Sequence, residues 1–346
     1  MKALRLYGPR DLRLVEEDVP RPAPGEALLR VRTVTVCHSD IHYYRFARIG
    51  DTVSDVPLVL GHEFCGEVVE VTPGIEGETG DTPAVGDLVA VEPAISCGRC
   101  RYCREGNPNL CDHLLFSGTP PLDGALREYL SIGAEFLFPL PTGFTADEGA
   151  LLEPLGVALH GWDLAKLRVG ASVAVVGCGP IGLLLIQLAR IGGAGQIVAV
   201  EPLEYRRALA RSWGAVALEP DEHLERHVRD LTEGHGVDVA IEAAGTLPAQ
   251  EEAARIVKKG GTVVAIGIPA EDQLIMTHHV IRRKGLTIKI ARRMKLTYPR
   301  AIALLARGQV TLEPLLTHHV GLADAEQAFR LVEQYADGVI KAAIHP

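Results

Sequence analysis

A glycine-rich turn in the middle of the chain joins an apolar segment to a segment of helical character. Gly177, Gly179 and Gly182 follow the β-branched run 172–176, and the residues up to about 191 have the pattern of a helix. The first glycine permits a tight turn, the second lets a pyrophosphate approach the backbone, and the third lets the helix pack against the strand. The helix N-terminus then faces the phosphates. The motif predicts a dinucleotide site, although a glycine-rich turn in an unrelated sheet would look the same.

The glycine-rich turn belongs to a longer alternation of strand-like and helix-like segments. Apolar, β-branched runs separated by stretches of helix length are 172–176, 197–200, 238–242, 262–268 and 287–290. Strands that are apolar throughout and alternate with helices predict a parallel sheet covered on both faces. The middle of the chain is therefore predicted to be a doubly wound α/β domain.

A carboxylate follows the glycine motif at the spacing found in dinucleotide-binding domains. Glu201 ends the next predicted strand, about twenty residues after the motif, where it can bind both ribose hydroxyls. A carboxylate there repels a 2′-phosphate, which favours NAD over NADP. Arg206, five residues later, could stack on adenine, contact the ribose or lie in solvent. The other residues assigned to the cofactor site are Pro180, Ile181, Ile266, Gly267, Ile268 and Arg293.

The first 150 or so residues have a different rhythm, with short apolar runs separated by glycine and proline. Runs of this kind are 27–36, 64–71 and 87–91. Short strands with frequent turn signals predict an all-β, barrel-like part. The acidic, glycine-rich stretch 74–83 is predicted to be a loop. Helical segments near the C-terminus, 299–308 and 324–334, could extend either part, because periodicity does not assign them.

Cysteine usage predicts a metal site. The chain has 346 residues and 7 cysteines, and an odd count in a large chain does not suit a disulfide-stapled secreted scaffold. Four of the cysteines lie in one loop, at Cys97, Cys100, Cys103 and Cys111. Four thiolates at this spacing satisfy a tetrahedral Zn²⁺ with no open position, which predicts a structural zinc site. Two disulfides or bound iron are the alternatives.

A second set of potential metal ligands is spread over three short motifs. Cys37 and His62 stand at the ends of two predicted strands, and Glu63 and Glu153 supply carboxylates. Mixed sulfur, nitrogen and oxygen ligands are expected of a catalytic zinc that keeps one position open. Each motif alone is ambiguous, because a buried cysteine is more often a small hydrophobic residue than a ligand.

The charge of the chain excludes some partners. Lys and Arg number 35 against 44 Asp and Glu, which gives a net charge of −9. An acidic chain does not favour nucleic acid or an anionic membrane surface as a partner. The apolar stretch 173–188 contains helix-interrupting glycines and a proline, so no membrane span is expected. The segment 1–7 has no apolar core of signal-peptide length, so the protein is expected to be cytoplasmic.

Together, these motifs resemble the zinc-dependent medium-chain alcohol dehydrogenase superfamily, and its sorbitol (polyol) dehydrogenase branch most closely. The segments that carry the resemblance are 37–44, 48–50, 61–63, 97–111, 116–121, 153–155 and 177–182, with Arg293. It implies an α/β protein in which a GroES-like β-barrel catalytic domain is interrupted by an inserted Rossmann domain with a doubly wound parallel sheet. The implied boundaries are 1–152 for the first catalytic part, 153–290 for the NAD-binding domain and 291–346 for the second catalytic part.

The resemblance also implies roles for the metal-site residues. Cys37 and His62 would hold a catalytic zinc, so that the chain binds two Zn²⁺ ions, one catalytic and one structural. The third ligand is left open between Glu63 and Glu153, of which Glu153 could instead hold the zinc-bound water. Asp40 would orient His62, as carboxylates beside metal-bound imidazoles do.

Catalytic and substrate roles follow from the same resemblance. Ser39 and His42 would form a relay in which the hydroxyl passes the substrate proton, through the cofactor ribose, to a surface imidazole. The residues implied to contact substrate are Tyr43, Phe116, Thr119, Glu153 and Arg293. Met294 departs from the polyol pattern, where a tyrosine is usual, and 204–207 is reminiscent of threonine 3-dehydrogenases.

The implied activity is the NAD-linked oxidation of a secondary alcohol to a ketone, by hydride transfer from a zinc-bound alkoxide. A small polyol such as sorbitol, xylitol or galactitol is the expected substrate. L-threonine 3-dehydrogenase and 2,3-butanediol-type dehydrogenase are the alternatives, and a non-catalytic NAD-binding protein is the remote one. By analogy the chain is expected to form a homotetramer or homodimer, with 262–269 pairing at the edge of the Rossmann sheet.

Overall fold

A computed structural model describes residues 1–54, 57–73 and 83–346 and divides into two compact units. One unit is formed by Met1–Pro154 together with Tyr298–Pro346, and the other by Leu155–Thr297. The chain leaves the first unit within helix α3 (Ala146–Ala165) and returns to it at α9 (Tyr298–Ala306). The predicted loop 74–83 lies, except for its last residue, outside the described part of the chain.

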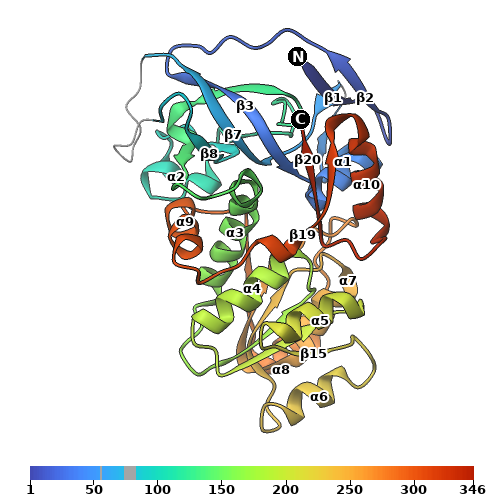
Figure 1. The fold of residues 1–346 in the computed structure, drawn as a ribbon. Helices are drawn as coiled ribbons and strands as arrows, with labels where there is room; N and C mark the ends of the chain where they lie inside the picture. The colour runs from blue at the N-terminus through green and yellow to red at the C-terminus, as the bar shows by residue number, and fades with distance from the viewer. Residues whose placement is uncertain (55–56, 74–82) are drawn as a thin grey trace. The chain divides into compact units, whose positions relative to one another are not determined.

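The first unit is built mainly of β-structure (Figure 1). Its strands are β1 (Lys2–Leu6), β2 (Leu12–Glu16), β3 (Glu26–Thr35), β4 (Arg48–Ile49), β5 (Thr52–Val53), β6 (Leu58–Val59), β7 (Glu63–Val71), β8 (Leu88–Val91), β9 (Ala94–Ile95), β10 (Leu115–Phe116), β11 (Tyr129–Gly133), β12 (Leu137–Pro139), β19 (Leu316–Gly321) and β20 (Lys341–His345). The largest sheet has the order β12-β8-β7-β3-β20-β19, and β11 also pairs with β3. The C-terminal strands therefore complete a sheet that the N-terminal strands begin.

Short helices cover parts of this β-structure. They are α1 (His38–Phe46), α2 (Arg101–Arg104) and α10 (Ala325–Gln334), with α9 and the start of α3. Helix α10 is amphipathic, because its buried residues recur at helical spacing on one face: Ala325, Ala328, Phe329 and Val332. The Phe329 ring packs 5.3 Å, between centroids, from the ring of Tyr44 on α1. This contact joins the two ends of the chain in one hydrophobic core.

The second unit is a doubly wound α/β domain, as the alternation of segments predicts. Its strands are β13 (Ser172–Val176), β14 (Gln196–Val200), β15 (Val216–Leu218), β16 (Val237–Glu242), β17 (Val257–Ala265) and β18 (Thr287–Ile290). They form one parallel sheet of order β15-β14-β13-β16-β17-β18, so the strand order reverses beside β13. This is the order of a Rossmann domain, in which ligands bind where the order reverses.

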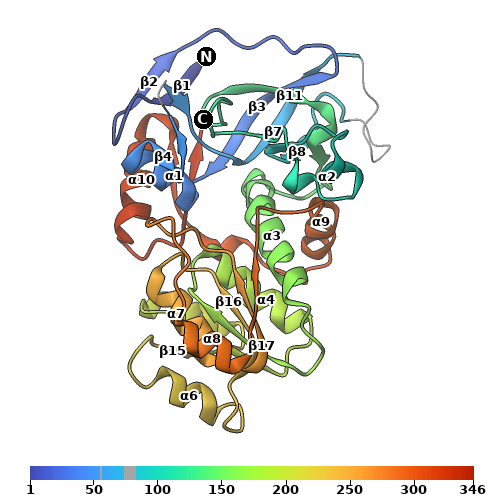
Figure 2. The same cartoon turned by 180° about the vertical axis from the view of Figure 1, so that it is seen from behind.

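Helices cover both faces of the parallel sheet. They are α4 (Pro180–Ile191), α5 (Glu204–Ser212), α6 (Leu224–Asp230), α7 (Leu247–Ile256) and α8 (His278–Lys284). Helices α4 and α5 lie on one face of the sheet and α7 and α8 on the other (Figure 2). The central strands β13, β14 and β16 are mainly apolar and almost wholly buried, as expected for strands covered on both faces, whereas β15, β17 and β18 also contain exposed residues.

Strand β17 differs from the prediction. It spans Val257–Ala265 rather than 262–268. Val257 pairs with Val237 of β16, the next paired residue after a register shift is Thr262, and the N–H groups of Ile266 and Gly267 turn to the carbonyl of Glu242. The expectation that 262–269 pairs with another subunit at the edge of the Rossmann sheet is wrong. Strand β17 lies between β16 and β18, and β18 is the edge strand on that side.

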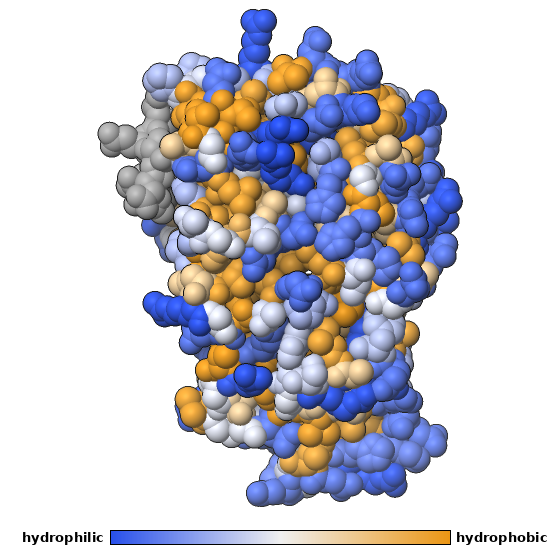
Figure 3. Space-filling model, in the orientation of Figure 1, coloured by the Kyte–Doolittle hydropathy of each residue, from blue (hydrophilic) through white to orange (hydrophobic). Residues whose placement is uncertain are grey.

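None of the helices in the described part of the chain is long and apolar enough to cross a membrane. On the face shown in Figure 3, hydrophilic residues are spread among apolar ones.

Candidate metal centres and cofactor site

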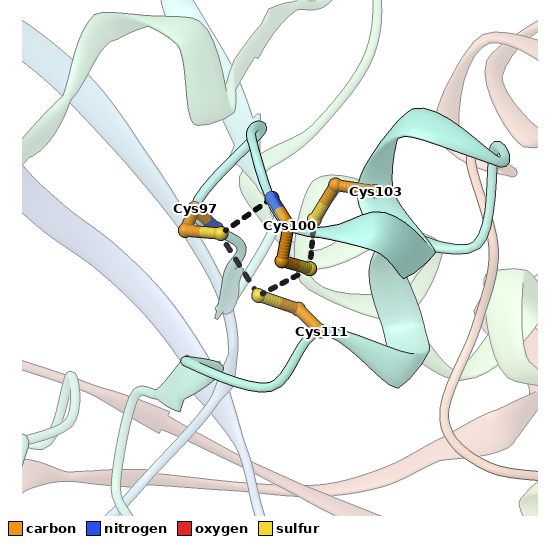
Figure 4. A group of neighbouring side chains, drawn as sticks. All are labelled: Cys97, Cys100, Cys103 and Cys111. Atoms are coloured by element: carbon orange, nitrogen blue, oxygen red, sulfur yellow. Dashed lines mark hydrogen bonds between the residues drawn. The ribbon is translucent and has the colours of Figure 1, made fainter.

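The four cysteines of the loop between β9 and β10 converge on one point (Figure 4). The sulfur of Cys100 is 3.5 Å from that of Cys103 and 3.9 Å from that of Cys111, and all four sulfurs lie within 4.8 Å of one another. Backbone N–H groups also donate to two of the sulfurs, from Cys100 to Cys97 and from His113 to Cys111, at 3.3 Å each.

These distances fit zinc and exclude disulfides. In a tetrahedral site with Zn–S bonds of about 2.3 Å, neighbouring sulfurs are about 3.8 Å apart, whereas bonded sulfurs are about 2.05 Å apart. Backbone N–H groups stabilise the thiolate form, and they lower the pKa of Cys97 below its ordinary value and that of Cys100 to about 6. The four predicted ligands of the structural zinc thus lie together, and no fifth His, Cys, Asp or Glu of the described residues belongs to this group.

A second ligand group forms where α1 and β7 begin. Cys37 is the N-cap residue of α1, and His62 and Glu63 follow the left-handed turn at Gly61, whose φ is 95°. One ligand atom from each of Cys37, His62 and Glu63 lies within 4.8 Å of the others. Sulfur, imidazole nitrogen and carboxylate oxygen are ligands that zinc takes in catalytic sites. The structure therefore brings together three of the four residues predicted for the catalytic zinc.

Asp40 fixes the geometry of this group. One carboxylate oxygen lies 3.3 Å from Nδ1 of His62 and accepts from the N–H of Gly61, and the other accepts from the N–H of Cys37 at 2.9 Å. Asp40 and His62 are both buried, yet the carboxylate raises the pKa of His62 well above its ordinary value despite burial. With Nδ1 directed at Asp40, Nε2 is the nitrogen left for a metal. Ser39 Oγ lies 3.3 Å from that Nε2.

Lys341 is a member of the site that the sequence analysis missed. Its ammonium lies 2.7 Å from Oε1 and 2.5 Å from Oε2 of Glu63, and it also donates to the carbonyl of Val36 at 3.2 Å. The hydroxyl of Thr35 donates to Oε2 of Glu63 as well. Lys341 is 4% exposed, and although burial opposes its charge, Glu63 raises its pKa above the ordinary value. A buried ion pair therefore stands beside the candidate metal ligands.

Glu153 lies within α3 and is 5% exposed. Burial, and then the charge of Glu63, raise its pKa to about 8, so the carboxyl group is largely protonated at neutral pH when no metal is bound. Among the described residues, Glu153 does not join the group whose ligand atoms lie within 4.8 Å of one another. Its electrostatic coupling to Glu63 and His62 nevertheless places it in their neighbourhood.

Phe116, which is predicted to contact substrate, lies against the ligand group, with its ring centroid 5.1 Å from that of His62. Thr119 lies in the same loop, and its N–H donates to the carbonyl of Phe116. Tyr43 is buried on α1.

Arg293 belongs to the second unit and has a left-handed backbone, with φ of 55°. Met294, beside it, is buried, and its sulfur would be 2.5 Å from a Cβ at Gly156.

His42 differs from the expected surface imidazole. It is only 9% exposed, and its ring centroid lies 5.9 Å from that of His38 and 6.4 Å from that of Phe46. These three residues stand at intervals of four on α1 and therefore share one helix face. Ser39 and His42 are three residues apart on the same helix, a spacing that makes their side chains neighbours.

The glycine motif has the geometry that a pyrophosphate site needs. Gly177 has a φ of 94°, and a Cβ there would meet the backbone of Ala244 at 2.7 Å. A Cβ at Gly182 would lie 1.8 Å from the carbonyl oxygen of Gly177. At Gly179, by contrast, the nearest atom to a Cβ is a guanidinium nitrogen of Arg206 at 3.9 Å. The first and third glycines are thus required by packing, and open space lies over the second.

Glu201 is held at the glycine loop. One of its carboxylate oxygens accepts from the N–H of Cys178 at 2.7 Å, and the other accepts from the N–H of Leu203 at 3.0 Å. Each oxygen keeps a lone pair that a ribose hydroxyl could use. Arg206 is buried, with its guanidinium carbon 5.5 Å from the ring centroid of Tyr205 and one nitrogen beside Gly179. Of the roles considered for Arg206, a position in solvent is excluded.

Glu242 is a second residue that the sequence analysis missed. It ends β16, is fully buried, and accepts from the N–H groups of Ala244 at 2.8 Å and Gly245 at 2.6 Å. Gly267 approaches so closely that a Cβ would lie 2.2 Å from the nitrogen of Gly245. Glu242 thus holds the loop that follows β16 and the loop that follows β17, near the point where the strand order reverses. The second loop contains 266–268, the segment predicted to contact the cofactor. A parallel sheet with such a site, in a chain that also carries two groups of zinc ligands, defines the class of zinc-containing dehydrogenases.

Comparison with known proteins gives the same class. The alcohol dehydrogenase GroES-like domain matches residues 23–142, and the zinc-binding dehydrogenase domain matches residues 180–307. Sorbitol dehydrogenase of Bacillus subtilis is 34% identical over 349 residues, which cover 100% of this chain and 97% of that protein. The chain therefore belongs to the zinc-binding alcohol dehydrogenase family, which confirms the resemblance seen in its motifs, and it is an oxidoreductase that acts on CH–OH groups.

Solved structures of similar proteins cover the whole chain. 2R,3R-butanediol dehydrogenase from Bacillus subtilis has a TM-score of 0.87 and 31% identity, and the match covers 100% of this chain and 99% of that one. A zinc-binding dehydrogenase from Sinorhizobium meliloti, bound to NADP, has a TM-score of 0.89 and 30% identity with the same coverage. The predicted fold class, a GroES-like part with a Rossmann domain, is confirmed.

Proposed function

We propose that the protein is an NAD-dependent, zinc-dependent dehydrogenase that oxidises a secondary alcohol of a small polyol to the ketone. The observation that carries this proposal is the ligand group of Cys37, His62 and Glu63, backed by Asp40 and a buried lysine. The whole-length similarity to a sorbitol dehydrogenase supports a polyol as the substrate. Two Zn²⁺ ions per chain would be held, one by this group and one by the four-cysteine loop.

Glu63 is proposed as the third ligand of the catalytic zinc. The ammonium of Lys341 contacts both oxygens of Glu63, and Oε2 also accepts from the hydroxyl of Thr35, so Oε1 is the oxygen with a lone pair to spare for a metal. Lys341 then balances part of the negative charge that the ligands concentrate in a buried place. Glu153, which lies outside the group of close ligand atoms, would instead hydrogen-bond the water or hydroxyl at the open position.

The bound zinc would supply Lewis acidity toward a hydroxyl oxygen, and NAD would supply the hydride acceptor. The chain's own residues hold and move the proton. Ser39 Oγ, beside Nε2 of His62, would accept the proton of the substrate hydroxyl, and His42 on the same face of α1 would take it onward. Phe116, against the ring of His62, would exclude water from one side of the carbinol.

NAD is the proposed cofactor because Glu201 stands at the glycine loop with both oxygens oriented by N–H donors. A 2′-phosphate would meet this carboxylate, which is unfavourable. Arg206 near Gly179 could offset part of that repulsion, and the similar protein from Sinorhizobium meliloti is bound to NADP. Kinetics with both cofactors decide the matter: we expect kcat/KM to be at least tenfold higher with NAD.

A substrate panel run beside metal analysis tests the proposal. Formation of NADH with sorbitol, xylitol and galactitol is compared with that from L-threonine and 2,3-butanediol, which the threonine-type motif at 204–207 and the similarity to butanediol dehydrogenase make the alternatives. We expect the highest kcat/KM with a polyol and a zinc content near two per chain. Zinc near one, with turnover of none of these alcohols, would instead indicate a non-catalytic NAD-binding protein.

The assignment of the third ligand has its own test. Glu63→Gln should lower the zinc content toward one per chain, because the amide is a poor zinc ligand, whereas Glu153→Gln should retain both ions and lower kcat. Loss of zinc from Glu153→Gln, with full retention in Glu63→Gln, would reverse the assignment.

A further inference from the structure

Two histidines and an aspartate lie together on the first unit, and none of them belongs to the two zinc centres described above. Asp147 stands in the first turn of α3, His319 on β19 and His345 at the end of β20. One potential ligand atom from each lies within 4.8 Å of the others. We propose that these residues form a third metal site, for a divalent transition-metal ion such as Zn²⁺, Ni²⁺ or Co²⁺.

The distances suit such an ion. Nδ1 of His319 is 3.2 Å from Nε2 of His345 and 3.6 Å from Oδ2 of Asp147. Ligand atoms of a tetrahedral zinc, with bonds of about 2.1 Å, are about 3.4 Å apart. Two imidazoles and one carboxylate are a ligand set that zinc and its neighbours among the transition metals accept, and they leave positions open for water.

Hydrogen bonds prepare His345 to act as a ligand. Its Nδ1 lies 3.3 Å from the carbonyl oxygen of Arg32. A carbonyl only accepts, so Nδ1 carries the proton, and in the neutral ring Nε2 keeps a lone pair directed toward His319. Metal-bound histidines characteristically donate their other N–H to a carbonyl or carboxylate in this way. His345 therefore already has the tautomer that a metal requires.

Asp147 is prepared by a buried hydroxyl. Thr33 is 1% exposed, and its hydroxyl donates to Oδ1 of Asp147 at 2.8 Å, which leaves Oδ2 facing His319. With Nε2 of the neutral His345 ring as the acceptor, Nδ1 of His319 would be the donor between the two rings in the metal-free protein. When a metal binds, that proton leaves Nδ1, and the neutral ring of His319 carries its proton on Nε2 instead.

The site is accessible to solvent and joins distant parts of the chain. The side chains of Asp147, His319 and His345 are 30%, 47% and 39% exposed, so an ion can enter without opening the core. A metal bound there would link α3, β19 and β20. It would stabilise the folded protein, because the unfolded chain does not bring these residues together. Strand β20 also carries Lys341, so the ion would hold the strand that serves the catalytic group.

The site is tested by titrating Zn²⁺ into tag-free protein whose two zinc centres are already filled, with calorimetry as the measure of binding. His319→Ala and His345→Ala remove ligands from exposed positions, and His318→Ala is the matched control, because His318 is the next residue on β19 and contacts Asp337 instead. We expect one additional equivalent of Zn²⁺ in the wild type and in His318→Ala, bound at least tenfold more weakly or not at all in the other two variants. Activity without added zinc should be unchanged in all of them.

Two further measurements separate a metal site from ordinary hydrogen bonding. Excess Zn²⁺ should raise the melting temperature of the wild type and of His318→Ala, but not of His319→Ala. Thr33→Val, which keeps all three ligands, should weaken binding by about 10–100-fold. An extra equivalent that persists in His319→Ala and His345→Ala would overturn the proposal, as would its absence from the wild type at millimolar zinc. Loss of the equivalent in His227→Ala, which lies on α6 of the second unit, would overturn it too.

Discussion

Replacing Lys341 with methionine should destabilise the protein strongly, because it leaves the Glu63 carboxylate buried without its partner. The two side chains are 4% and 2% exposed, and the ammonium contacts both carboxylate oxygens. Removing one member of a buried ion pair typically costs about 3–5 kcal/mol. For a chain of 346 residues unfolding as one unit, this corresponds to a fall in melting temperature of about 4–7 °C.

The matched control is Lys258→Met, which removes the same type of side chain from an ion pair with Asp238 at 2.5 Å. That pair is 42% and 32% exposed, so its loss should cost no more than about 1 kcal/mol. The assay is thermal unfolding of the metal-depleted protein followed by circular dichroism. The double variant Glu63→Gln with Lys341→Met should lose less stability than the sum of the two single variants.

Comparing the zinc-loaded protein with the metal-depleted protein gives a second test. If Glu63 binds the catalytic zinc, the ion compensates its charge, and the loss of stability caused by Lys341→Met should be smaller in the zinc-loaded protein than in the metal-depleted one. A melting temperature for Lys341→Met equal to that of Lys258→Met, with additive effects in the double variant, would refute the argument that this ion pair is a coupled buried unit.

Three further predictions follow from the site. In the metal-depleted protein, stability should fall as pH rises from 4.5 toward 8, because the folded state keeps Glu153 protonated while the unfolded state does not; this contribution is at most about 5 kcal/mol. Glu153→Gln should reduce the slope measured by urea unfolding at several pH values, and the part that remains comes from His62, whose pKa is also raised in the folded state. Gly182→Ala should abolish NADH binding or folding, since its Cβ would overlap the carbonyl of Gly177, and fluorescence titration with NADH checks this. Cys100→Ser should lose one zinc ion per chain in metal analysis and melt at a lower temperature than the wild type. Cys178→Ser is the control: it replaces a buried cysteine outside the metal groups and should keep the full zinc content.

The parallel sheet was predictable because its strands are apolar on both faces and therefore visible as continuous runs. The strands β13 and β18 have the predicted bounds, and β14 and β16 begin one residue earlier. Strand β17 was harder, since Lys258 and Lys259 follow its first residue and lie within the register shift between its pairs with β16 at Val257 and at Thr262. Tertiary pairing overrides local composition in such a segment.

The candidate site was predictable where local spacing carries the chemistry. The four cysteines of the loop and the pair formed by His62 and Glu63 are close in sequence, so their types and intervals already indicate a metal. Lys341 had no such signal, because it begins a short apolar strand 278 residues after its partner Glu63 and looks like an ordinary exposed lysine in the sequence. It becomes buried because β20 inserts beside β3, where Thr35 already binds the same carboxylate. Burial of a charge is decided by sheet order, and sheet order between distant strands is not written in the local pattern.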